Sequence, residues 1–125
     1  RDAALLQASA NGNSDPELVK RLLEAQCSPN VVVRPLWRRW RAIYRAASIW
    51  TRSGGTPSPL FEHFAHIDGC APLHAAACQG NLAVMKVLLA ARADPVLRNG
   101  LGETPLEMAA WCFGGEAPEL VADLL

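Results

Sequence analysis

The chain repeats itself, and the period of that repetition limits the folds open to it more than any other feature. The stretch DGCAPLHAAACQGN at 68–81 returns in altered form as LGETPLEMAAWCFGG at 101–115. Gly69, Pro72, Leu73 and Ala76 each have an identical residue 33 positions later. A unit of this length cannot bury its apolar face alone, so we expect one structural unit per period and a stack of such units.

Two longer offsets agree with this period. GNSDPELVKRLL at 12–23 matches GGEAPELVADLL at 114–125 with an offset of 102, which is three times 34. Leu22, Leu23 and Pro29 recur 66 positions later, which is twice 33. The repetition therefore reaches from the first residues to the last.

These residues resemble the ankyrin repeat, in which a turn and a TPLH-x-A motif open a short helix, a glycine follows, and a second helix ends in Leu-Leu. The clearest unit is DGCAPLHAAACQGNLAVMKVLLAARADP at 68–95, and the resemblance covers about 1–30 and 68–125. It implies a single all-α ankyrin-type solenoid over 1–125, with about four repeats. Their expected bounds are about 1–30, 31–67 (aberrant), 68–100 and 101–125 (truncated).

Helix-start signals agree with this expectation. Thr104 can cap a helix whose first residue is Pro105, because the missing N–H of proline costs nothing at that position. Asp15 and Pro16 form the same pair at the start of a second helix. The usual Thr of the motif is Ala71 in the unit at 68–95, so that helix start should be weaker by about 1 kcal/mol.

Helix ends and turns carry signals of their own. Gly80 can end one helix and Asn81 can start the next. Alanines at 75–77 and 109–110 should let helices approach closely. RNGLG at 98–102 contains the Asn-Gly pair typical of a tight hairpin turn, which corresponds to the ankyrin finger.

Residues 31–67 occupy the length of one repeat but lack its motif. An amphipathic helix is expected from about 35 to 52, because the apolar residues there follow the spacing of one helical face. Those residues are Leu36, Trp40, Ile43, Ala47 and Trp50. The segment is either a degenerate second repeat or an insertion that replaces one, and the 66-residue offset favours the degenerate repeat.

The net charge is zero, but it is unevenly distributed. Between Val31 and Phe61 there are six arginines and no acidic residue, so the rest of the chain has a net charge of −6. This asymmetry indicates a partner-facing patch or an internal pairing of the two surfaces. A hydrophobic content of 50% argues against a disordered chain.

The four cysteines lie at 27, 70, 78 and 112 and include no CxxC pair. An oxidised secreted domain of this size usually carries a denser framework. We therefore expect reduced thiols and an intracellular or organellar location. Because the chain begins without Met, we expect it to be a piece of a longer protein.

His66, Cys70, His74 and Cys78 recur at intervals of four residues, which raises the question of zinc. The Gly and Pro between them break the continuous helix that such a site would need. In the ankyrin family the histidine of the TPLH motif, here His74, is structural. Cys78 has no accompanying oxyanion motif, so no metal, cofactor or catalytic residue is expected.

The Arg/Trp segment leaves four interpretations open. It can be a core helix that packs Trp40, Ile43 and Trp50 on the stack and leaves its arginines solvated. It can be a docking surface for an acidic protein, because Arg and Trp are enriched in binding hot spots. A basic amphipathic helix can also lie on a membrane surface. Nucleic acid is the least favoured partner, because no known reader motif appears.

In ankyrin-like stacks, partners usually meet the finger tips and the inner face of the first helices. By motif position these surfaces carry Cys78, Gln79, Arg98, Trp111 and Cys112. With the Arg/Trp segment added, the expected partner-binding residues are Trp37, Arg38, Arg41, Arg45, Cys78, Gln79, Arg98, Trp111 and Cys112.

The expected function is non-catalytic protein–protein interaction, with a partner that has an acidic surface and with no small-molecule substrate. The alternative is a structural accessory subunit built permanently into a large assembly, for example a photosynthetic or respiratory membrane complex.

Overall fold

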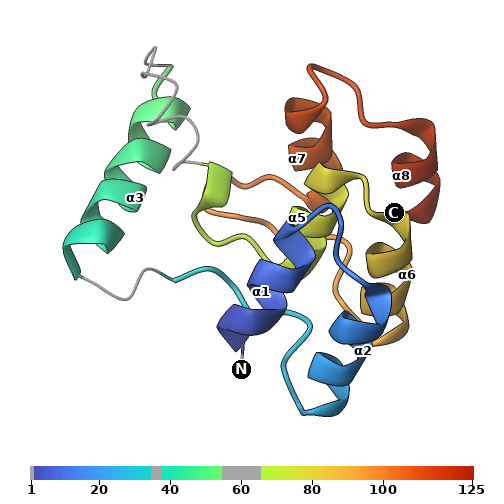
Figure 1. The fold of residues 1–125 in the computed structure, drawn as a ribbon. Coiled ribbons are helices and arrows are strands. Elements are labelled where there is room, and N and C mark those ends of the chain that lie inside the picture. Colours follow the sequence, from blue (N-terminus) through green and yellow to red (C-terminus); the bar gives the residue numbers. More distant parts are fainter. Residues whose placement is uncertain (1, 35–37, 55–65) are drawn as a thin grey trace.

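The structure, a computed structural model, describes residues 2–34, 38–54 and 66–125, which form α-helices joined by turns and include no strand. Figure 1 shows their arrangement. The helices are α1 (Asp2–Ala10), α2 (Pro16–Glu24), α3 (Arg38–Arg52), α5 (Pro72–Gln79), α6 (Leu82–Ala90), α7 (Pro105–Cys112) and α8 (Glu119–Leu124).

Three helix–turn–helix pairs stack side by side (Figure 1). The first helices form an inner row in which α5 packs between α1 and α7. The second helices form an outer row in which α6 packs between α2 and α8. This arrangement confirms the expected all-α ankyrin-type solenoid.

The core runs between the two rows. Its largest fully buried apolar side chains are Leu5, Val19, Leu73, Val84, Met85, Leu88 and Val121. Ala76, Ala77 and Ala109 are all 0% exposed, and their small side chains allow the inner helices to approach closely. In the Leu-Leu pair of α6, Leu88 is fully buried and Leu89 packs against the core.

The repeat that contains α1 and α2 packs directly on the one that contains α5 and α6. Two side chains bridge these repeats. Asn81 Nδ2 donates to Gly12 O at 3.3 Å, and Asn30 Oδ1 accepts from Asp94 N at 2.7 Å. Figure 1 shows α3 to one side of this stack. The two repeats that flank 31–67 in the sequence are therefore in direct contact, an arrangement that an insertion between them permits.

The helix starts follow the sequence signals. Thr104 Oγ1 accepts from Glu107 N at 3.3 Å, and Glu107 Oε2 accepts in return from Thr104 N at 2.8 Å. This reciprocal pair is a capping box. Asp15 Oδ1 accepts from Glu17 N at 2.9 Å, and Asn81 Oδ1 accepts from Val84 N at 3.2 Å.

The finger at 99–103 is a turn held by one buried side chain. Asn99 Oδ1 accepts from the backbone N–H groups of Leu101 and Glu103, at 3.1 and 2.9 Å. The left-handed backbone falls on Gly102, with φ +82°, and not on Asn99 or Gly100. The turn is therefore present as expected, but the Asn-Gly pair does not form the tight two-residue hairpin that it suggested.

The start of α5 lacks a side-chain cap. Ala71 has no oxygen to offer, and its own N–H donates to His74 Nδ1 at 3.2 Å. The backbone at Ala71 is extended, as a capping residue requires. The missing Thr therefore leaves an orphan N–H in the first turn of α5.

Replacing Ala71 by Thr should raise the free energy of unfolding by about 0.5–1 kcal/mol, because the hydroxyl would cap α5. Ala71 borders a hollow on the inner face, which leaves room for the added atoms. Urea unfolding of the variant and of Ala71→Val, which has the same shape without the hydroxyl, measures the effect. An equal gain in Ala71→Val would show that capping is not its cause.

Candidate functional site

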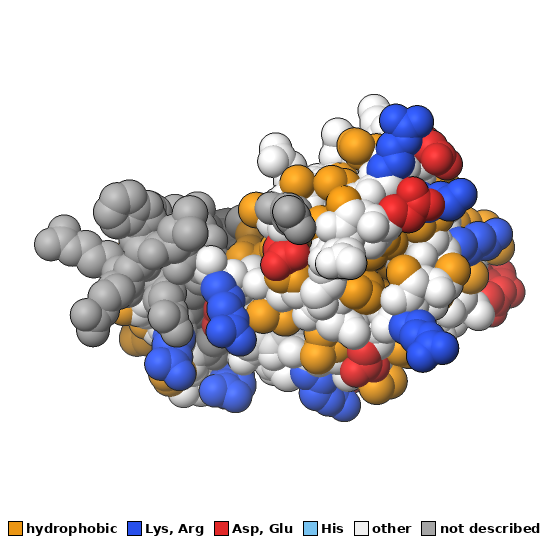
Figure 2. All heavy atoms as spheres, turned by 90° about the horizontal axis from the view of Figure 1, so that it is seen from below, with side chains coloured by type: hydrophobic (Ala, Val, Ile, Leu, Met, Phe, Trp, Pro, Cys, Tyr) orange, Lys and Arg blue, Asp and Glu red, His pale blue; other side chains and the backbone are white. Residues whose placement is uncertain are grey.

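α3 exposes apolar and basic side chains together. Ile49 is 58% exposed and Trp50 is 59% exposed, and Arg45 and Arg52 are also exposed. Ala47, which is fully buried, is the exception among the described side chains of α3. In the space-filling view, basic and hydrophobic side chains lie close together beside the grey segment (Figure 2).

On the apolar face that the spacing defines, Ala47 is buried, but Trp50 is 59% exposed and Ile43 is 36% exposed. The interpretation of α3 as a core helix that packs Ile43 and Trp50 on the stack therefore does not hold for these two side chains. The side that lies near the stack instead carries Arg45, Ile49 and Arg52. The spacing of apolar residues correctly predicted a helix, but it did not show which side of that helix meets the stack.

These three side chains border a hollow of about 480 Å³, which we call the arginine hollow. Asp68 and Gly100, which belong to the part of the stack next to the finger, also line it. Two guanidinium groups on one helix can bind carboxylates in a bidentate manner. The arginine hollow therefore combines two guanidinium groups with the carboxylate of Asp68.

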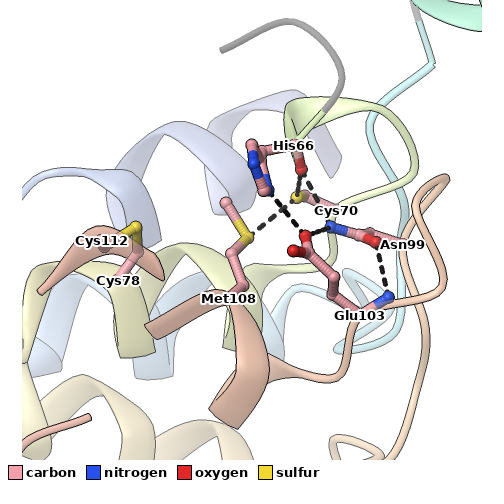
Figure 3. The surroundings of a disulfide bond; sticks show 7 residues. All are labelled: His66, Cys70, Cys78, Asn99, Glu103, Met108 and Cys112. Carbon is pink, nitrogen blue, oxygen red and sulfur yellow. Dashed lines mark hydrogen bonds and ion pairs between the residues drawn. A yellow bond between two sulfur atoms is a disulfide. The ribbon is translucent and has the colours of Figure 1, made fainter. Parts of the chain in front are cut away.

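Cys78 and Cys112 are joined by a disulfide between α5 and α7 (Figure 3). Their Cα atoms are 5.5 Å apart, a separation that suits a disulfide. The expectation of reduced thiols is wrong for this pair, whereas Cys27 and Cys70 are free and buried. Cys78 and Cys112, which were both predicted to contact a partner, are therefore bonded to each other on the inner face.

A buried polar cluster fixes the finger to the residues that follow the insertion (Figure 3). His66 Nδ1 lies 2.7 Å from Glu103 Oε2, and Asn99 Nδ2 donates to the same oxygen at 2.9 Å. Asn99 Nδ2 also donates to His66 O at 3.1 Å. The ring of His66 stacks on Trp111 with centroids 3.7 Å apart.

Cys70 belongs to this cluster as a donor. Its thiol donates to His66 O at 2.8 Å and contacts Met108 Sδ at 3.4 Å. Burial raises the pKa of Cys70 to about 12. The group therefore stays a thiol at neutral pH and does not act as a nucleophile.

His74 is the structural histidine that the motif implied. The Ala71 N–H donates to Nδ1, so the ring proton must lie on Nε2, which donates to Glu103 O at 3.0 Å. Burial lowers the pKa of His74, because a second ring proton would be desolvated and would face the Ala71 donor. His74 therefore ties α5 to the finger as a neutral ring.

The remaining predicted contact residues are scattered. Gln79 is exposed at the end of α5, and Trp111 is 37% exposed beyond its stack with His66. Arg98 lies 3.6 Å from Glu107 Oε2 at the finger. Trp37 lies outside the described residues, as do the side chains of Arg38 and Arg41.

The sequence did not reveal the partnership of His66, Glu103 and Asn99. The sequence contained one weak signal of this cluster, because Asn99 lies 33 residues after His66, which is one repeat period. Among the described residues, no three His, Cys, Asp or Glu side chains come together as a metal site. No helix in the described ranges is long and apolar enough to cross a membrane.

A stack of helix pairs with projecting turns and an exposed inner row defines a helical-repeat protein whose surfaces bind other proteins. Residues 5–125 match the model of the family described as ankyrin repeats (3 copies). The chain therefore belongs to the ankyrin repeat family. Proteins of this family generally bind other proteins and are typically not enzymes, which supports a binding module.

The disulfide should stabilise the last repeat. Cys112→Ser should lower the free energy of unfolding of the oxidised protein by roughly 3–4 kcal/mol, the chain-entropy value for a loop of this length. Guanidinium unfolding with and without dithiothreitol measures the difference. Cys27→Ser is the control, because Cys27 is free and this variant keeps the disulfide. Its unfolding should respond to the reductant as that of the wild type does, whereas the unfolding of Cys112→Ser should not respond. A wild-type midpoint that ignores dithiothreitol would contradict the prediction.

Stability should fall in two steps as the pH is lowered. The pKa of His74 lies below its ordinary value of 6.5, so the unfolded chain binds the first proton and stability drops below pH 6.5. Burial raises the pKa of Glu103, but the hydrogen bonds from His66 and Asn99 outweigh it. That pKa therefore lies below its ordinary value of 4.5, and a second drop follows below pH 4.5.

Urea unfolding between pH 8 and pH 3.5 measures both steps. His74→Asn should be less stable than the wild type at every pH. Its stability should fall less than that of the wild type below pH 6.5, because the contribution of His74 to that step is removed. An increase in wild-type stability between pH 6.5 and pH 5 would contradict the assignment of His74 as a neutral buried ring.

Proposed function

We propose that the chain binds an acidic surface of another protein through α3, with the arginines and Trp50 as the main contacts. The observation that carries the proposal is the exposure of α3. Among its described side chains, Ala47 is the exception that is buried. Arg and Trp are the residue types most often found at binding hot spots.

The charge of α3 supports an acidic partner. The helix contains five arginines and no acidic residue. Arg41 and Arg45 are four positions apart, a spacing at which like charges repel on a helix. Carboxylates from a partner would relieve this repulsion and would pair with guanidinium groups in a bidentate manner.

The described arginines of α3 have little opposite charge beside them. Neither Arg45 nor Arg52 belongs to the ion pairs that join Arg21 to Glu17, His66 to Glu103 and Arg98 to Glu107. Among the described residues that line the arginine hollow, the acidic one is Asp68, which already makes an interaction of its own. An external partner would supply the further carboxylates that these arginines can bind.

A second candidate is a structural subunit built permanently into a larger assembly. The exposure of Ile49 and Trp50, at 58% and 59%, favours it, because permanent interfaces are more apolar than transient ones. In that case α3 would exchange its amide hydrogens quickly in the isolated chain and slowly in the assembly. A transient binding module would keep α3 protected in both states.

Reversing the charge of Arg45 and Arg52 should weaken partner binding by at least about tenfold. The test immobilises the wild-type chain and the Arg45→Glu/Arg52→Glu variant and compares quantitatively the proteins that each retains at low and high salt. Partners of the wild type should be acidic and should be lost from the variant. High salt should weaken the wild-type interaction, because the contacts are exposed.

Lys20→Glu/Lys86→Glu is the matched control, since it changes the same number of charges at exposed positions of α2 and α6. An unchanged partner set for the α3 variant would contradict the proposal. Vesicles that contain phosphatidylserine provide the other comparison. Wild-type binding to them, without retention of any acidic protein, would identify α3 as a membrane-surface helix instead.

A further inference from the structure

The inner face of the stack contains a hollow that the proposed contacts on α3 do not use. We call it the inner hollow; its volume is about 310 Å³. Leu6 of α1, Ala75 of α5 and Met108 of α7 contribute to its walls. Val33 and Ile67, which lie near the two ends of the insertion, also line it.

Small side chains create this space. Ala10, Ala71 and Ala75 stand where larger residues would fill the junction between α1 and α5. The lining is apolar apart from Gln79, which is exposed. Apolar walls that face empty space lack the packing contacts of a core, so an apolar group that fits gains those contacts.

The size of the inner hollow indicates what it can hold. About 310 Å³ lies at the lower end of the range of roughly 300–1,000 Å³ for ligand pockets. Few polar groups converge on the space to orient a small molecule. A single bulky aliphatic or aromatic side chain suits it better.

The charges beside the inner hollow are mixed but mainly basic. Val33 is followed directly by the exposed Arg34. Ile67 is followed by the acidic Asp68, which borders the arginine hollow together with Arg45 and Arg52. Charge complementarity to these three arginines therefore favours a segment that carries acidic residues beside its anchor.

We infer that the inner hollow receives one bulky apolar side chain of an acidic peptide segment, whose neighbouring carboxylates bind the arginines of α3. This inference rests on the proposed function. It narrows the partner from an acidic surface to an acidic segment with a single aliphatic or aromatic anchor. The inner hollow and the arginine hollow then act as two parts of one binding site.

The test begins with a phage-displayed library of random peptides, which is selected on the full chain. Selected peptides should share one Leu, Ile, Met, Phe or Trp flanked by Asp or Glu. The strongest is synthesised with a fluorescent label, and its affinity is measured by anisotropy. Filling the inner hollow by Ala75→Leu should weaken binding at least about tenfold.

Ala10→Leu is a second way to fill the inner hollow, and it is less prone to disturb folding because Ala10 is exposed at the end of α1. Ala83→Leu makes the same substitution at an exposed position of α6, away from the inner hollow, and should bind as the wild type does. Circular dichroism and thermal unfolding identify any variant that does not fold.

The outcomes separate the two proposals. If Arg45→Glu/Arg52→Glu loses the peptide while both filling variants keep it, the inner hollow is not the anchor site and the proposed function stands. If the filling variants lose the peptide and the arginine variant keeps it, both the acidic part of the inference and the proposed function fail. A selection that yields basic peptides, or none, overturns the inference.

Discussion

The packing of α5 between α1 and α7 is the contact on which the rest of the structure depends. These helices have eight or nine residues each, well below the roughly 12–15 at which an isolated helix becomes even marginally stable in water. Their helicity must therefore come from tertiary contacts, and fully buried alanines such as Ala76 and Ala109 permit the close approach. The same approach brings Cys78 and Cys112 within bonding range and encloses the inner hollow.

The insertion is tolerated because both of its ends are fixed to the stack. On the entry side, Val33 N donates to Cys70 O at 2.8 Å. On the return side, His66 is held by its contact with Glu103, its stack on Trp111 and the thiol of Cys70. The entropic cost of closing a loop rises only slowly with its length. A long segment can therefore leave and rejoin the stack while the repeats on either side remain in direct contact.

The sequence predicted what is encoded locally. The caps at Asp15, Asn81 and Thr104 and the roles of Gly80 and His74 follow from short motifs, and the structure confirms them. The arrangement of 31–67 could not be predicted, because an offset of two periods favours a degenerate repeat but also fits an insertion that replaces one. The disulfide and the cluster around His66 join residues that are 34 and 37 positions apart, so they depend on how neighbouring repeats pack. No local pattern reports that packing.

The orientation of α3 shows why its amphipathic spacing misled the prediction and why the helix is suited to binding. The inner row already seats α5 against α1, so the stack offers no vacant place between them for an apolar helical face. α3 instead lies beside the finger with Arg45 and Arg52 toward the arginine hollow, while Trp50 remains exposed. Exposed charges are screened within about 8 Å at physiological ionic strength, so the net negative charge spread over the stack does little for these arginines. Under the proposed function, the partner's carboxylates would supply the opposite charge, and its apolar side chains would cover Ile49 and Trp50.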